Sequence, residues 1–142
     1  MRSRTKAREI SLQLLYEYDA TREMPDERIS SFLNEFTDKA EAREYARKIV
    51  AGVIENYNEI DDFIKQFAEH WTVARMPIVD RNILRIGVLE LLFEKDVPAK
   101  VVINEAVELA KRFGSADSGR FINAILDRTH KEQQKQTDTK QH

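Results

Sequence analysis

The sequence is poor in the residues that turn or cross-link a chain: it has no cysteine, four glycines and three prolines among 142 residues. The lack of cysteine excludes disulfides, thiolate zinc sites, iron–sulfur clusters and thiol nucleophiles, and it fits a reducing cytoplasm. An all-β sandwich needs a turn signal every ~8–12 residues, and the glycines and prolines are too few for that. These absences argue against an all-β fold, and we expect a cytoplasmic protein.

Long apolar runs are missing as well. The most apolar stretch, residues 83–93, is interrupted by Arg85 and Glu90, and it falls short of the ~20 residues that a membrane span needs. The N-terminus is basic and then amphipathic, without the continuous apolar region of a signal peptide. We therefore expect a soluble chain in which the two interrupting charges are buried and need partners.

Apolar residues instead recur at helical spacing along almost the whole chain. The pattern predicts about seven helices and no strand, with Pro25, Pro77 and Pro98 at three of the helix starts. Residues 78–93 are apolar in nearly every direction, which is typical of a helix surrounded by others. We expect one all-α domain over residues 1–128, with helical subdomains over about 1–71 and about 77–128. Residues 129–142 are polar and are expected to form a disordered tail.

The net charge of −2 hides an uneven distribution. Residues 1–8 carry four positive charges and no acid, whereas residues 9–128 carry a net charge of −7. A basic end on an acidic body attracts phosphate or an acidic partner to that end and repels nucleic acid from the rest. An ordinary solvated helix start is the competing interpretation of these four cations.

A second candidate site is the segment of residues 115–121. It combines small residues, an arginine and an aromatic ring with a predicted helix start, whose free N–H groups bind phosphate. Such a set can also stack an unpaired base. The competing interpretation is a helix cap with Phe121 in the core.

Motifs for catalysis or cofactor binding are absent from the sequence. There is no glycine-rich phosphate loop and no Gly-x-Ser-x-Gly elbow, and the three histidines are too scattered for a metal site. We therefore expect a protein that is not an enzyme and that has no cofactor or metal.

Four segments in order carry a family resemblance. They are Lys6-Ala-Arg8-Glu with Leu14-Leu-Tyr16, Asp80-Arg-Asn-Ile-Leu-Arg85-Ile with Leu89-Glu90-Leu, Asp96-Val-Pro98 with residues 103–111 and Phe113-Gly, and Phe121-Ile-Asn123-Ala-Ile-Leu-Asp127. In this order and spacing they resemble the NusB family of bacterial transcription antitermination factors. The resemblance covers about residues 2–128.

The resemblance implies an all-helical adaptor of two small packed bundles, not an enzyme. Members of the family pair with NusE, which is also a small-subunit ribosomal protein, and the pair binds the boxA element of nascent leader RNA, notably in ribosomal RNA operons. The RNA-bound pair helps to hold an antitermination complex on RNA polymerase. Whether the chain is a monomer or a homodimer is left open.

The resemblance also implies the site residues. RNA contacts are expected from two regions, comprising Arg2, Arg4, Lys6 and Arg8 at the start and Asp117, Ser118, Arg120 and Phe121 near the last helix. Tyr16 and Asp80 fall where family members meet NusE. For the two RNA regions to act as one site, the start of the first helix must lie beside the start of the last, and we expect this arrangement.

Two other interpretations stay open. One is a helical protein-interaction or dimerisation module without a role in RNA binding. The other follows from a related domain at the N-terminus of some ribosomal RNA methyltransferases. The chain ends about 15 residues after the last matching segment, so we expect the free-standing factor.

Overall fold

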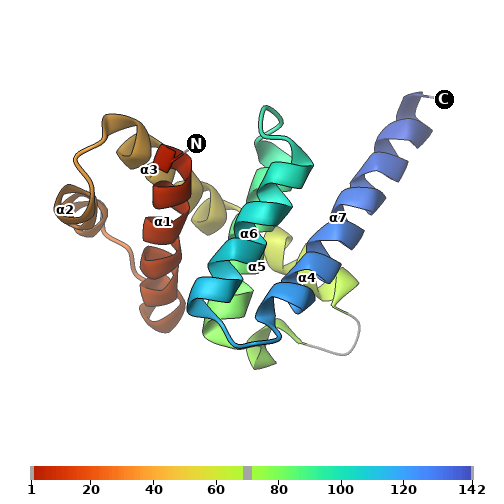
Figure 1. The fold of residues 1–142 in the computed structure, drawn as a ribbon, viewed down its shortest axis with the longest axis horizontal. Coiled ribbons are helices and arrows are strands. Elements are labelled where there is room, and N and C mark those ends of the chain that lie inside the picture. Colours follow the sequence, from red (N-terminus) through yellow and green to blue (C-terminus); the bar gives the residue numbers. More distant parts are fainter. Residues whose placement is uncertain (1, 69–71, 142) are drawn as a thin grey trace.

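The computed structural model describes residues 2–68 and 72–141, except for the side chains of Arg2 and of residues 137–141. Within that part of the chain it has seven α-helices, one 3-10 turn and no strand (Figure 1). They are α1 Arg2–Thr21, α2 Asp26–Phe36, α3 Ala40–Glu55, α4 Tyr57–Phe67, the turn η1 Val73–Arg75, α5 Ile78–Phe93, α6 Ala99–Phe113 and α7 Ser118–Gln141. The predicted all-α fold class is confirmed. None of the described helices is long and apolar enough to cross a membrane.

Prolines set the starts of three helices. Pro25, Pro77 and Pro98 come directly before α2, α5 and α6, with φ angles of −62°, −53° and −59°. Proline fixes φ near this value and lacks an N–H, so it loses nothing at a helix start, where the first N–H groups have no helical partner. The carbonyls of Pro77 and Pro98 accept the first helical hydrogen bonds, from the N–H groups of Arg81 and Val102.

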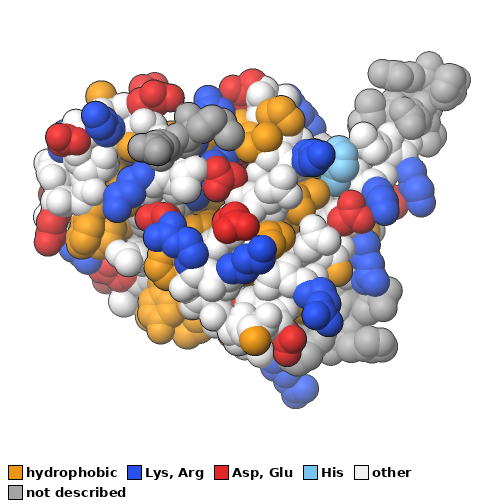
Figure 2. Space-filling view, viewed as in Figure 1, with side chains coloured by type: hydrophobic (Ala, Val, Ile, Leu, Met, Phe, Trp, Pro, Cys, Tyr) orange, Lys and Arg blue, Asp and Glu red, His pale blue; other side chains and the backbone are white. Residues whose placement is uncertain are grey.

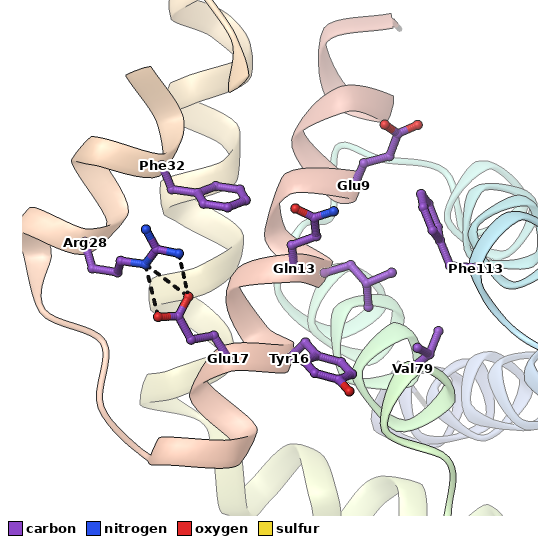
Figure 3. Close-up of a pocket in the computed structure, with 9 residues that line it drawn as sticks. Glu9, Gln13, Tyr16, Glu17, Arg28, Phe32, Val79 and Phe113 are labelled. Carbon is purple, nitrogen blue, oxygen red and sulfur yellow. Dashed lines mark hydrogen bonds and ion pairs between the residues drawn. The ribbon is translucent and has the colours of Figure 1, made fainter. Parts of the chain in front are cut away.

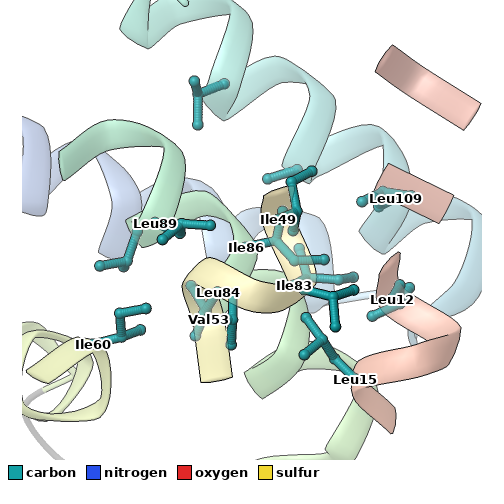
Figure 4. Close-up of a cluster of buried hydrophobic side chains, with 14 of the residues drawn as sticks. Leu12, Leu15, Ile49, Val53, Ile60, Ile83, Leu84, Ile86, Leu89 and Leu109 are labelled. Atoms are coloured by element: carbon teal, nitrogen blue, oxygen red, sulfur yellow. The ribbon is translucent and has the colours of Figure 1, made fainter. Parts of the chain in front are cut away.

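Helix α5 lies at the centre of the fold. It is buried without interruption from Asn82 to Leu91, and it contacts α1, α3, α4, α6 and α7. Figure 4 shows its side chains among apolar side chains of neighbouring helices, among them Leu12, Ile49, Ile60 and Leu109. Gly87 lets α7 approach closely, because a Cβ there would lie 2.7 Å from Cδ1 of Leu126. The prediction of a surrounded helix is confirmed.

The helices form two groups that share one core. In Figure 1, α1, α2 and α3 lie on one side and α6 and α7 on the other, while one buried apolar cluster includes residues from both groups. Helix α4 contacts α3, but it packs more extensively against α5 and α7. The division into subdomains at about residues 71–77 stays a prediction, and residues 69–71 lie outside the described part of the chain.

The C-terminus differs from the expected disordered tail. Helix α7 continues to Gln141, and Thr129 is fully buried, with its hydroxyl donating to the carbonyl of Ile125 at 2.9 Å. His130 and Gln133 line a small pocket together with residues of the α5–α6 turn. The argument from polar composition failed because lysine, glutamate and glutamine are good helix formers, and residues 129–141 contain no glycine or proline.

A buried ion cluster holds the C-terminal end of α1 against α5 and α4. The carboxylate of Asp19 accepts hydrogen bonds from Arg81 at 2.6 and 2.9 Å, from Asn82 at 3.0 Å and from Arg85 at 2.9 Å. Arg85 also donates to both oxygens of Asp61, at 2.8 and 3.0 Å. Only 3% of the Asp19 and Arg85 side chains is exposed. The expectation that Arg85 is buried with partners is confirmed.

This cluster predicts a pH-dependent contribution to stability. Burial alone would raise the pKa of Asp19, but the donors Arg81 and Asn82 and the charge of Arg85 outweigh it, so this pKa lies below its ordinary value of 3.8. A carboxyl with a lowered folded-state pKa stabilises the fold above its unfolded pKa and loses that effect as the pH falls through its folded pKa. We therefore expect Asp19→Asn to lower the free energy of unfolding at neutral pH, and to cost progressively less below about pH 4.

Urea denaturation of the unaltered protein and of Asp19→Asn, at about pH 7 and about pH 3, measures the loss of stability at each pH. The matched control is Asp62→Asn on the exposed side of α4, which makes the same chemical change outside the cluster. A stability deficit of Asp19→Asn that is the same at both pH values would contradict the assignment.

Candidate functional site

Residues 2–8, the first two turns of α1, are called the basic tip below. The Arg4 guanidinium lies 4.6 Å from the centroid of the Tyr45 ring, within the range of a cation–π interaction. Its Nη2 lies 3.5 Å from Oδ2 of Asp96. Lys6 is exposed, with Nζ 3.9 Å from a carboxylate oxygen of Glu9. Arg4 and Lys6 are therefore within reach of a ligand, whereas the Arg2 side chain lies outside the described part of the chain.

Arg8 belongs to the interior instead. Only 2% of it is exposed, and its Nε and Nη2 each donate to Glu90 at 2.8 Å, while Nη1 lies 3.5 Å from Glu105. The Tyr45 hydroxyl donates to Glu90 at 2.6 Å; burial, together with this bond, raises the Tyr45 pKa above its ordinary value of 10.0. A buried two-point ion pair is not available to RNA, so the expected role of Arg8 as an RNA contact is corrected to a structural one. Glu90 has the buried partner that its sequence position predicted.

A signal for this correction exists in the sequence. Arg8 precedes Leu12 and Leu15 by four and seven residues, so it lies on the apolar side of α1. Glu90 was already identified as a buried charge in need of a partner. Two buried charges of opposite sign are expected to pair with one another.

The basic tip is less positive in the fold than in the sequence. Every described cation in it lies within 4.0 Å of a carboxylate: Arg4 of Asp96, Lys6 of Glu9, and Arg8 of Glu90. Figure 2 accordingly shows acidic and basic side chains interspersed over α1 and α6, not one positive surface.

A serine side chain holds the turn that precedes α7. Ser118 is 2% exposed, and its Oγ accepts a hydrogen bond from the Ser115 N–H at 2.9 Å. Gly114 leaves the room for this, because a Cβ there would lie 2.6 Å from that oxygen. Ser118 thus shapes the turn, which corrects its expected role as a direct RNA contact. Asp117 and Arg120 are exposed.

A pocket of about 340 Å³ lies between the starts of α5 and α7. It is lined by Arg75, Pro77, Asp80, Ser115, Asp117, Ser118 and Phe121. Asp80 is 5% exposed, and its Oδ1 is buried without a hydrogen-bond partner among the residues described. Phe121 is half-buried and packs against the core. The pocket thus joins three of the expected RNA residues to Asp80, which was expected to meet NusE.

The two expected RNA regions do not meet, so the prediction that they lie side by side is wrong. The basic tip lies beside Asp96, just beyond the C-terminal end of α5, whereas Phe121 lines a pocket with Pro77 at its N-terminal end. The 16 residues of α5 separate these ends by about 24 Å. In Figure 1, α1 starts at the upper side of the molecule and α7 starts at the lower side. The cause is the course of α6, whose side chains contact α1 first at the basic tip, through Glu105 and Thr5, and then further along, through Arg112 and Glu9, so that α7 begins at the far end.

A second concave surface, called the apolar groove below, lies between α1, α2 and the ends of α5 and α6 (Figure 3). It measures about 380 Å³ and is lined by Glu9, Leu12, Gln13, Tyr16, Glu17, Arg28, Phe32, Val79 and Phe113. Tyr16 and Phe113 are 48% and 41% exposed, so both present apolar surface to solvent. Figure 2 shows hydrophobic side chains gathered over this end of α1.

Sequence reasoning found Tyr16 but missed two other groove residues. Val79 and Phe113 had the spacing of core positions in their helices. Periodicity tells which side of a helix is apolar, but it does not tell whether another helix covers that side. Val79 precedes Asp80 in the first turn of α5, so the apolar groove and the pocket beside Asp80 are neighbours.

No group of three or more histidine, aspartate or glutamate side chains suited to a metal ion occurs among the residues described. The described part of the fold offers open surfaces and a set of exposed charges, an arrangement suited to binding.

Comparison with known proteins gives one consistent result. The NusB family model matches residues 5–131. The transcription antitermination protein NusB of Desulforapulum autotrophicum is 44% identical over 130 residues, which cover 90% of this chain and 91% of that protein.

Solved structures agree. NusB of Thermotoga maritima superimposes with a TM-score of 0.80 at 42% identity, covering 91% of each chain. A crystal structure of the antitermination factors NusB and NusE in complex with double-stranded RNA contains a chain with a TM-score of 0.83 at 33% identity, covering 93% of this chain and 98% of that one.

The distinction between Arg8 and Arg4 can be tested by stability. Removing one member of a buried ion pair leaves an uncompensated charge, so we expect Arg8→Ala and Glu90→Ala each to cost about 3–5 kcal/mol. Arg4→Ala removes a partly exposed pair and is expected to cost less than about 1 kcal/mol. Urea denaturation of the three variants measures this, and an Arg8→Ala variant as stable as the Arg4→Ala variant would refute the structural role of Arg8.

Proposed function

The chain belongs to the NusB family, and from this premise we propose that it is a non-catalytic transcription antitermination factor. In this proposal it binds boxA of nascent leader RNA together with NusE, and the RNA-bound pair supports an antitermination complex on RNA polymerase. The observation that carries the proposal is the match of the family model to residues 5–131. The likeness to a chain from a complex of NusB, NusE and RNA supports it further.

The proposed RNA contacts lie in two places. At the basic tip they are Arg2, Arg4 and Lys6, which supply positive charge for phosphates. At the start of α7 they are Asp117, Arg120 and Phe121, which combine exposed polar groups with an aromatic ring. Proteins recognise single-stranded RNA by stacking its bases on aromatic or arginine planes while basic groups hold the backbone.

One RNA strand would have to span both places. Their separation is about 24 Å. We propose that the strand runs along α6, which extends from beside the basic tip to the turn before α7. In this proposal Arg8 and Ser118 do not contact the RNA. Arg8 fixes the position of α1, and Ser118 fixes the turn before α7.

The apolar groove is the proposed surface for NusE. Exposed aromatic side chains are enriched in protein interfaces, and Tyr16 and Phe113 are the two in this groove. Glu9 and Glu17 at its edge are paired with Arg112 and Arg28, so the feature that suits a basic ribosomal protein is the net charge of −7 on residues 9–128. Asp80 lies beside the groove, but it is 5% exposed and its Oδ1 is buried, so in this proposal it helps to shape the NusE surface from beneath.

Binding of labelled boxA RNA, followed by fluorescence anisotropy over a salt series with and without NusE, tests the RNA proposal. We expect a preference for boxA over a scrambled RNA and tighter binding with NusE. Arg4→Ala should weaken boxA binding and reduce the salt slope by about 0.7 for the phosphate contact it loses. Lys65→Ala on α4, which also removes one exposed positive charge, should change the affinity little.

Equal binding of both RNAs in the presence of NusE would contradict the proposal. The chain would then have to be explained as a protein-interaction or dimerisation module, for which the apolar groove remains available.

The NusE surface has its own test. We expect Tyr16→Ala to weaken NusE binding about tenfold, because a large aromatic side chain at the centre of an interface is a typical hot spot. Phe93→Ala is the matched control. Phe93 is also a large exposed side chain, at 45%, but it is the last residue of α5, whereas the groove lies at the start of that helix. Titration calorimetry with purified NusE measures both, and equal affinities of the two variants would rule out the groove.

A further inference from the structure

We propose that Asp96 competes with RNA phosphate for Arg4, and that it thereby sets the RNA affinity of the basic tip. The inference rests on the proposed function, because it assumes that the basic tip binds RNA. It adds a residue that contacts Arg4 in the free protein and lowers the affinity of this surface for RNA.

The geometry of the pair carries the inference. Asp96 lies in the turn between α5 and α6, and its Oδ2 is 3.5 Å from Nη2 of Arg4. The two side chains are 67% and 34% exposed, so solvent reaches both. A carboxylate and a phosphate bind guanidinium N–H groups in the same way. The carboxylate therefore occupies a position on Arg4 that a phosphate oxygen would take.

Arg4 does not depend on Asp96 for its place. Its guanidinium lies over the Tyr45 ring, and Tyr45 is itself fixed by its hydrogen bond to the buried Glu90. Breaking the contact with Asp96 therefore leaves Arg4 near Tyr45 and frees the N–H groups that faced the carboxylate.

Nearby charges do not replace Asp96 in this role. Glu94, the other acid of the same turn, pairs with Lys48 at 2.8 Å. The turn is closed by a backbone hydrogen bond from the Val97 N–H to the Glu94 carbonyl at 3.1 Å. A substitution of Asp96 that removes only its charge therefore leaves this hydrogen bond in place.

Asp96 weakens RNA binding because its ion pair with Arg4 must open before a phosphate can bind there. The pair is exposed, so its effect is modest, and pairs of this kind correspond to about a two- to fivefold change in an equilibrium constant. The buried Arg8–Glu90 pair cannot exchange in this manner, since only 2% of Arg8 is exposed.

The test is a double-mutant cycle on boxA binding, measured by anisotropy with NusE present. We expect Asp96→Asn to bind boxA about two- to fivefold more tightly than the unaltered protein. This gain should shrink as the salt concentration rises, because salt screens both the Arg4–Asp96 pair and the contact of Arg4 with phosphate. In the background of Arg4→Ala the same substitution should give no gain. Asp62→Asn, which changes the net charge equally on α4, is the control and should leave the affinity unchanged.

The outcomes separate the inference from the proposed function. Weaker binding by Arg4→Ala with no gain from Asp96→Asn would overturn the inference and leave the function standing. A gain that persists in the Arg4→Ala background, or that Asp62→Asn matches, would also overturn it. Absence of boxA binding by every protein, even with NusE, would refute the function and the inference with it. Melting temperatures of all variants confirm that each one is folded.

Discussion

Buried charge holds α1 against α5, and both proposed binding surfaces depend on that contact. Arg8 pairs with Glu90 near the start of α1, and Asp19 pairs with Arg85 near its end. Breaking either pair leaves a charge buried without a partner, which destabilises far more than losing a surface pair. Because α1 carries both the basic tip and Tyr16, these two pairs fix the proposed RNA surface and the proposed NusE surface relative to one another.

Burial divides the cations of the basic tip into two kinds. Arg8 is enclosed and shapes the fold, whereas Arg4, one helical turn away, is partly exposed and paired with an exposed acid. Non-specific binding to nucleic acid comes almost entirely from basic side chains that neutralise phosphates. Because each described cation of the tip has a carboxylate neighbour, we expect the tip alone to attract RNA weakly. In the account proposed here, stable binding needs the second contact region on α7 and the help of NusE.

The sequence predicted what depends on local spacing and left out what depends on the path of the chain. Helical periodicity and three prolines predicted the all-α fold and the starts of α2, α5 and α6. Apolar neighbours predicted that Arg85 and Glu90 are buried with partners. The partner of Glu90 is Arg8, 82 residues away, and no local pattern joins such positions. The separation of the basic tip from Phe121 follows from the course of α6. The helix beyond Thr129 follows from the helix propensities of its side chains, which an argument from polar composition does not consider.

The central claim is that boxA contacts the basic tip and the start of α7, while NusE contacts the apolar groove. Backbone amide chemical shifts of the isotope-labelled protein, followed first with boxA RNA and then with NusE added, test it most directly. The account predicts that boxA shifts the amides of residues 3–8 and 117–121, and that NusE then shifts those around Tyr16 and Phe113. Shifts by boxA confined to the apolar groove, or the same shifts with a scrambled RNA, would contradict it.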